Sequence, residues 1–337
     1  MRRGASARAI LVCIDRNRTQ LTMDDTALRI LLLLADSLLP ISVGYFLSRR
    51  GLVSRATTQK LITFNVRVMF TILAFISFWK LPFSKDTAIL PVLGILVLLF
   101  PYFIGMLMTR KNPDPLERGA LVLSAMLGNT GAIGGLVSYL ILGPIAYAYV
   151  QVVAVVQNFL IIVFCFPVCQ RFHDLANTDG SAVKKRSFAE LFFTWNQISL
   201  IGMIAGGALS AFSVPQPPLF DAVFSAFIHI SCWINFLPVG LLLNFEAASK
   251  FMRQVTGIIP LKFVFVPAVT WAVSELLVSD PTIIRTMVIL AATPTAINAV
   301  VSCALYRLET DLTMASFIGT TILFAAVLCP VFFVLWA

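Results

Sequence analysis

The chain has 337 residues, of which 59% are hydrophobic and 12% are charged, and its net charge is +9. Soluble domains carry about 25% charged residues, so this composition excludes a water-soluble globular protein. The basic residues lie in polar segments between apolar ones and form no single patch, which argues against nucleic-acid binding.

Ten apolar segments are long enough to cross a bilayer, which takes about 20 residues each. In chain order, the predicted spans are Leu28–Leu47, Leu61–Trp79, Ala88–Met108, Ala120–Leu142, Ile145–Cys169, Leu191–Phe212, Leu219–Phe245, Val255–Val278, Ile283–Leu305 and Met314–Trp336. The longest polar connection, residues 170–190, divides them into five and five. An odd number of spans per half means that the second half enters the membrane from the opposite side, as in an inverted repeat.

The expected fold class is therefore an all-α polytopic membrane protein with ten transmembrane helices in a 5+5 inverted repeat. A basic tail, residues 1–26, precedes one membrane domain, residues 27–337. Within that domain, residues 27–169 form the first repeat and residues 191–337 the second, and residues 170–190 connect them.

Basic residues are distributed unevenly among the connections. Those after odd-numbered spans are Arg49, Arg50, Arg55, Lys60, Arg110, Lys111, Arg118, Arg171, Lys184, Lys185, Arg186, Lys250, Arg253 and Arg307, and those after even-numbered spans are Lys80, Lys85 and Arg285. The positive-inside rule then predicts a multi-pass cell-membrane protein with loop 170–190 in the cytoplasm and both termini outside.

The N-terminal tail argues against that orientation. Six arginines lie in the tail or just after it: Arg2, Arg3, Arg8, Arg16 and Arg18 in the tail, and Arg29 at the start of the first span. Translation from Met23 would remove five of them, and a tolerated basic arm is the other account. We favour the start at Met23.

Ionisable side chains inside apolar spans are rare and mark functional positions. Asp36, Arg67 and His229 are the candidates for a coupling ion, a proton or sodium. A structural pair with a basic residue is the alternative for Asp36, and a hydrogen-bonded packing role is the alternative for His229. Lys262 and Glu275 lie near helix ends, where we expect their side chains to snorkel to the membrane surface.

Two spans, the fourth of each half, contain residues that interrupt a helix. The first interruption is Gly128–Gly135, rich in glycine and containing Asn129 and Thr130, and the second is Thr293–Asn298, which contains Pro294. Close helix packing is the structural alternative for the glycines. Broken helices at matching positions in two halves are typical of a transporter's binding centre, since unwound backbone in a bilayer must face protein or a watery cavity.

The remaining candidate chemistry is sparse. The cysteines, Cys13, Cys165, Cys169, Cys232, Cys303 and Cys329, are scattered and are expected to be core residues. Paired carboxylates, a Ser/His pair and a His/Glu metal cluster are missing from the spans, so we expect no enzyme, no metal and no cofactor. The alternatives that remain are a ten-helix drug/metabolite-type exporter, an intramembrane enzyme and an ion channel.

Four stretches give the chain a family resemblance: Gly44–Leu52, Gly128–Gly131, Pro260–Lys262 followed by Pro267, and Ala291–Asn298. With these motifs the chain resembles the auxin efflux carrier family, which takes in plant PIN-type carriers and bacterial permeases for malate, malonate and similar acids. The resemblance implies a ten-helix secondary carrier whose broken fourth and ninth helices cross near the membrane midplane and hold an anion. Family members often have a proline beyond the fourth-span motif, where Gly135 and Leu136 stand here.

The expected function is transport of a small organic anion, an auxin-like, malate-like or malonate-like acid, by alternating access. A half-helix that begins at a break offers free backbone N–H groups and the positive end of its dipole to a carboxylate. The expected substrate-binding residues are Asn129, Thr130, Gly131, Thr293, Pro294, Thr295 and Asn298. The expected partners are this anion, membrane lipid, a coupling ion and a second copy of the chain in a homodimer.

Overall fold

Helices make up all the secondary structure of the computed structural model, apart from one isolated backbone bridge, within residues 28, 31–176, 199–243, 246 and 249–336, which the structure describes. The predicted all-α class is confirmed. The expected N-terminal tail, residues 1–26, and residues 177–190 of the expected loop lie outside the described residues.

The first half forms long helices joined by short turns, beginning with a first helix over Leu31–Arg49. The elements that follow are α2 (Arg55–Phe64), the π-helical turn η1 (Asn65–Met69), α3 (Phe70–Trp79), α4 (Lys85–Met108), α5 (Pro115–Met126), η2 (Thr130–Gly134), α6 (Gly135–Leu142), α7 (Pro144–Leu160), η3 (Ile161–Cys165) and α8 (Phe166–Ala176). The π-helical turns continue their neighbours, so Pro144–Ala176 is a single helix. Residues 170–176, expected in the central loop, are helical because they contain no glycine or proline.

The second half repeats this pattern. Its elements are α10 (Ser199–Ala211), α11 (Leu219–Leu242), α13 (Met252–Val255), α14 (Ile258–Pro260), η5 (Leu261–Phe265), α15 (Val266–Leu277), α16 (Pro281–Ala291), α17 (Ile297–Leu305), α18 (Thr310–Leu323), η6 (Phe324–Leu328) and α19 (Cys329–Trp336). Met252–Leu277 and Thr310–Trp336 are each one apolar helix.

Helices α5 and α16, which open the fourth and ninth predicted spans, begin in the same way. Asp114 and Asp280 precede them, and each is followed by a proline. Their carboxylates accept hydrogen bonds from the amides of Leu116 at 2.8 Å and Thr282 at 2.7 Å. An aspartate at the N-cap with proline at the first helical position is a strong helix start.

Seven helices in the described residues are long and apolar enough to cross a membrane, rather than the ten predicted. The fourth and ninth spans are interrupted, which leaves the shorter apolar helices Thr130–Leu142 and Pro281–Ala291. The sixth span is described only from Ser199, and its apolar helix there is Leu200–Ala211. The shortfall thus arises at the two breaks and at the edge of the described residues.

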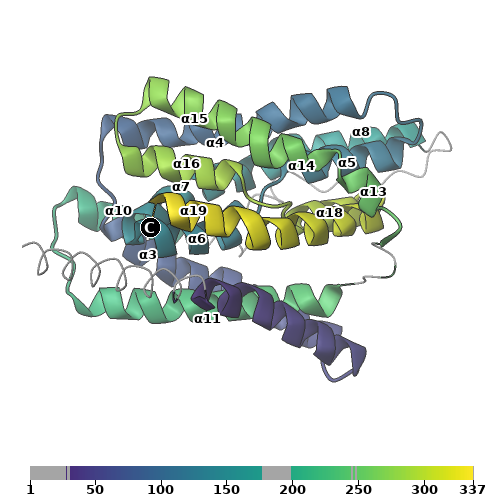
Figure 1. Cartoon of the computed structure of the whole chain (residues 1–337). Helices are drawn as coiled ribbons and strands as arrows, with labels where there is room; N and C mark the ends of the chain where they lie inside the picture. The colour runs from purple at the N-terminus through teal and green to yellow at the C-terminus, as the bar shows by residue number, and fades with distance from the viewer. Residues whose placement is uncertain (1–27, 29–30, 177–198, 244–245, 247–248, 337) are drawn as a thin grey trace, which may run out of the picture.

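The helices gather into two groups (Figure 1). The smaller bundle consists of the first helix, Arg55–Trp79, α10 and α11, and the larger bundle consists of α4 to α8 and α13 to α19. In Figure 1, α11 and the first helix run along one side of the molecule, and α4 and α15 run along the opposite side.

Glycines bring the helices of the smaller bundle into backbone contact. A Cβ on Gly202 or Gly206 of α10 would clash with the carbonyl oxygens of Thr71 and Phe75 on α3, and a Cβ on Gly240 of α11 would clash with the backbone of the first helix. Small residues four apart allow such close approach in membranes. The close contacts indicate that the smaller bundle is held together as one unit.

Candidate functional site

The two predicted breaks lie against each other and share backbone hydrogen bonds. Gly128 and Thr295 form an antiparallel bridge. The Asn129 amide donates to the Pro294 carbonyl at 2.8 Å, and the Ala296 amide donates to the Leu127 carbonyl at 2.9 Å. Each unwound segment thereby satisfies polar groups of the other, which is the condition for irregular backbone at membrane depth.

Glycine makes this approach possible at the first break. A Cβ on Gly128 would lie 2.5 Å from the Thr293 hydroxyl oxygen, and a Cβ on Gly134 would lie 2.6 Å from a Leu290 methyl carbon. The structural alternative, close packing, therefore applies to these two glycines. Gly131 differs, since its added Cβ would meet only Ala154 at 3.9 Å.

At the second break, Pro294 has no N–H group to continue the helix. Its neighbours Ala292 and Ala296 leave the helical conformation, with Ala296 extended at φ −76° and ψ 150°. Helix α16 therefore ends at Ala291, and α17 starts afresh at Ile297.

Side chains from other helices satisfy further groups at the first break. The Gln157 amide of α7 donates to the Gly128 carbonyl at 2.8 Å and accepts from the Thr130 hydroxyl. The Lys262 ammonium of η5 donates to the carbonyls of Ala125 at 3.1 Å and Leu127 at 3.5 Å. A cation suits the negative end of the α5 dipole.

The expectation that Lys262 snorkels to the membrane surface is wrong. Its side chain is only 3% exposed, because it lies mid-way along the helix Met252–Leu277 and turns inward onto the end of α5. Sequence reasoning missed Gln157 entirely and misjudged Lys262. The sequence feature that would have flagged both is a polar or charged side chain inside an apolar span.

The expected threonines use their hydroxyl hydrogens within the protein. Thr293 donates to the Leu290 carbonyl at 2.7 Å, and Thr295 donates to the Ser124 carbonyl at 2.9 Å. The Thr295 amide donates to the Thr320 hydroxyl of α18 at 3.0 Å. These contacts hold the break in place.

The expected asparagines differ in exposure. Asn129 is 9% exposed, whereas Asn298, in the first turn of α17, is exposed. Neither side-chain amide hydrogen-bonds to another described residue. An amide buried to this degree without a partner costs free energy, which favours a ligand or water beside Asn129.

Both half-helices that follow the breaks begin with unpaired amides. Within the described chain, the N–H groups of Thr130, Gly131 and Ala132 at the start of η2 have no acceptor, nor do those of Ile297 and Asn298 at the start of α17. The first amides of a helix lack intrahelical partners, and here no cap replaces them. The paired breaks thus present two sets of free donors.

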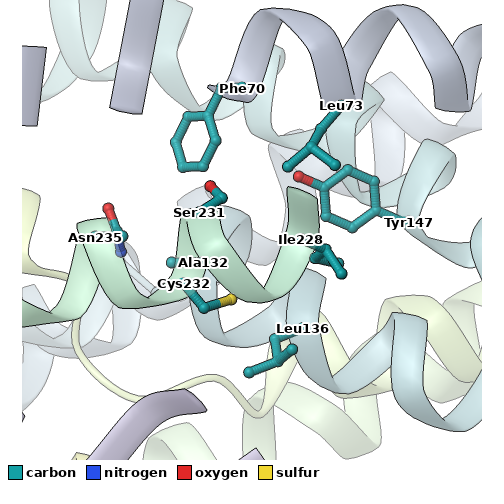
Figure 2. Close-up of a pocket in the computed structure, with 9 residues that line it drawn as sticks. All are labelled: Phe70, Leu73, Ala132, Leu136, Tyr147, Ile228, Ser231, Cys232 and Asn235. Carbon is teal, nitrogen blue, oxygen red and sulfur yellow. The ribbon is translucent and has the colours of Figure 1, made fainter. Parts of the chain in front are cut away.

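A small cavity lies between the two bundles, next to the first of these helix starts (Figure 2). Its lining residues are Phe70, Leu73, Ala132, Leu136, Tyr147, Ile228, Ser231, Cys232 and Asn235. Its volume is about 10 Å³, room for about one water molecule. The smaller bundle contributes α11 and the first turn of α3, and the larger bundle contributes η2, α6 and α7.

The coupling candidates are distributed between two places. Asp36 of the first helix and His229 of α11 form an ion pair, with Asp36 buried and His229 partly exposed. The basic residue that contacts Asp36 is His229. Arg67 is separate from this pair, because its side chain is exposed on η1.

The cysteines Cys165, Cys169, Cys232, Cys303 and Cys329 are buried free thiols. Among the described residues, no group of three or more His, Cys, Asp or Glu side chains is arranged to hold a metal ion.

Residues 33–185 match a family model described as membrane transport protein. The match runs from the first helix into the expected central loop and includes the first of the two breaks. No curated protein matches the chain.

Proposed function

We propose that the chain, whose residues 33–185 match a membrane transport family, is a member of the auxin efflux carrier family. We further propose that it is a secondary transporter that binds a small organic anion at the paired helix breaks. The observation that carries this proposal is the pair of half-helix starts, at Thr130 and Ile297, whose amides have no acceptor in the described chain. Helix N-termini with free amides and the positive dipole end favour anions.

Charge supports the choice of an anion. Lys262 is a buried cation behind the first break, and no described carboxylate pairs with it. Coulomb interactions are strong in a medium of low dielectric constant, so its positive field reaches the neighbouring helix start. Asn129 and Asn298 add amide donors without a fixed charge.

Within this proposal, the expected binding residues take two roles. Asn129, Gly131 and Asn298 contact the anion, Gly131 through its backbone amide. Thr130, Thr293 and Thr295 instead hold the breaks in shape, since their hydroxyl hydrogens are already donated within the protein.

Repeated local features support the 5+5 inverted repeat. The fourth and ninth spans both open with Asp-Pro and both break after one half-helix. The fifth and tenth spans each contain a π-helical turn, η3 and η6, with a proline in the second position of the next helix, Pro167 and Pro330. Matching irregularities at matching positions are typical of an internal duplication.

The two bundles support alternating access as the mechanism. We propose that the larger bundle, which carries both breaks, moves against the smaller bundle, whose helices are locked together by glycine contacts. The cavity between them is closed to about one water molecule, as expected for a conformation without substrate access. We also propose that loop 170–190 and the other basic connections are cytoplasmic.

A binding screen of mono- and dicarboxylates against the purified protein, followed by uptake into proteoliposomes, tests the proposal. We expect Asn129→Ala and Asn298→Ala each to reduce uptake of the identified acid by about tenfold or more, since a hydrogen bond to a charged group is lost. Asn158→Ala, at an exposed asparagine of α7, is the control and should transport normally. No bound acid, or full uptake by both variants at normal expression, would remove the proposal.

We further propose that the Asp36–His229 pair binds the coupling ion and that this ion is a proton, since a carboxylate and an imidazole are titratable groups and sodium prefers a shell of oxygen ligands. Among the described residues, Cys232 of α11 also lies close to Asp36.

In proteoliposomes, Asp36→Asn should abolish the stimulation of uptake by a pH gradient while leaving substrate binding intact. Asp221→Asn, at the other ion-paired carboxylate of the smaller bundle, is the matched control. Uptake driven by a sodium gradient, or an unchanged pH response in Asp36→Asn, would count against the pair.

A further inference from the structure

The smaller bundle provides one wall of the cavity, and this wall is polar at one place. Ser231 and Asn235 of α11 line the cavity there, while Ala132, with its free amide, lines it from the larger bundle (Figure 2). We propose that Asn65 positions the Asn235 amide as a donor for a neutral oxygen of the transported acid. This inference rests on the proposed anion site and adds the class of its substrate.

Asn65 contacts α11 through both the oxygen and the nitrogen of its side-chain amide. Its side chain is 1% exposed, its carbonyl oxygen accepts from the Ser231 hydroxyl at 2.9 Å, and its amide nitrogen donates to the Asn235 oxygen at 3.4 Å. Both ends of the Asn65 amide are therefore used, and a buried amide in this state has a fixed orientation.

The orientation of Asn235 follows from this contact. Its oxygen faces Asn65, so its Nδ2 group, which carries two hydrogens, points elsewhere. Nδ2 donates to no other described residue. A pair of donors on the wall of a cavity favours an acceptor, which no described residue supplies there.

The local backbone supports a functional role for Asn65. Asn65 begins the π-helical turn η1, which interrupts an otherwise regular helix from Arg55 to Trp79. Such turns are energetically unfavourable and occur frequently at functional sites. Here the turn lies at the position where the side chain reaches α11.

The rest of the lining determines the class of acid. Besides Ser231, Asn235, the Tyr147 hydroxyl and the Cys232 thiol, the described lining is apolar, and no lining residue is Asp, Glu, Lys or Arg. A second carboxylate would be buried there without a cation, which is costly. Once the cavity opens, the substrate whose chemistry matches this lining is a monocarboxylate with an apolar body and a neutral carbonyl oxygen some carbons from the carboxylate, rather than a dicarboxylate.

The test measures dissociation constants on the purified full-length protein by calorimetry. The ligands are two matched pairs: pentanoate with 4-oxopentanoate, and hexanoate with 5-oxohexanoate; succinate serves as the dicarboxylate. The wild type should bind at least one oxo acid about five- to tenfold more tightly than its alkanoate, the worth of one hydrogen bond, and should bind succinate more weakly than either.

Substitutions at two positions, Asn235 and Asn65, separate positioning from packing. Asn235→Leu should remove the preference for the oxo acid while alkanoate binding stays within about twofold of the wild type. Asn65→Asp still accepts from Ser231 but cannot donate to Asn235, so the Asn235 amide turns toward it and the preference should be lost with Asn235 intact. Asn65→Leu, which adds no charge, should lose the preference in the same way if Asn65→Asp fails to fold.

The outcomes distinguish this inference from the proposed function. If the wild type binds alkanoates without preferring an oxo acid, or if Asn235→Leu keeps the preference, this inference is overturned while the anion site stands. If the wild type binds succinate more tightly than the monocarboxylates, the substrate class is wrong. If it binds none of these acids, and Asn129→Ala changes nothing, the anion site fails and this inference with it.

Discussion

Lys262→Met is expected to lose most transport activity and to weaken the fold around the first break. The ammonium is buried and donates to the last carbonyls of α5, Ala125 and Leu127. Methionine fills the same space but leaves these carbonyls without that donor, which costs about 1–3 kcal/mol of unfolding free energy. The positive field beside the proposed anion site disappears at the same time.

Lys262→Gln separates the two effects. Glutamine can donate to a carbonyl but carries no charge, so this variant should recover part of the stability while its KM for the acid stays raised. Thermal unfolding in detergent and uptake kinetics in proteoliposomes measure the two quantities. Lys250→Met, at an exposed lysine, should match the wild type in both. A wild-type KM in Lys262→Gln and Lys262→Met would mean that the charge plays no part in binding.

Gln157→Leu is expected to have the second large effect. Gln157 donates to the Gly128 carbonyl and accepts from the Thr130 hydroxyl, so it joins the two ends of the first break. Leucine leaves both groups without their partner, and we expect a loss of roughly 1–3 kcal/mol in unfolding free energy. The start of η2 would then be held less firmly, and uptake should fall by about tenfold, equivalent to about 1.4 kcal/mol.

Gln157→Glu is expected to affect substrate binding more strongly than Gln157→Leu does. An ionised glutamate still accepts from Thr130, but it repels the Gly128 carbonyl and places a negative charge beside the anion site. Its KM should therefore rise further than that of Gln157→Leu. Asn158→Leu, at the exposed neighbouring position, is the matched control. Equal KM values in Gln157→Leu, Gln157→Glu and the wild type would show that Gln157 does not shape the site.

These predictions concern residues that sequence reasoning did not select, and the reason is distance along the chain. Lys262 lies 137 residues from Ala125, and Gln157 lies 29 residues from Gly128. The local pattern of apolar residues, glycines and prolines does not predict either contact. The Asp36–His229 pair is similar, because each residue was found as a charge in an apolar span but their pairing across 193 residues was not.

The difference between local pattern and long-range contact also explains why the roles of the threonines were not predicted. Thr130, Thr293 and Thr295 were selected because they lie in the breaks, which is a local property. Whether a hydroxyl is free to bind an anion depends on the carbonyl or amide oxygen that it meets in the folded chain, such as that of Ser124 or Leu290. The glycines at the first break could not be told apart from the sequence either. Only the tertiary structure shows that Gly128 and Gly134 have no room for a side chain, whereas Gly131 has.

The sequence by itself determined that this is a helical membrane protein and where two of its helices break, because both depend on local chemistry. Hydrophobicity over some 20 residues selects a span, and Pro294 lacks the N–H group that a continuing helix needs. Only the tertiary structure decided that the two breaks pair backbone to backbone, that Gln157 and Lys262 hydrogen-bond to the first of them, and that Asn65 contacts Asn235. Those outcomes depend on which surfaces pack together, and packing joins groups that the chain keeps far apart.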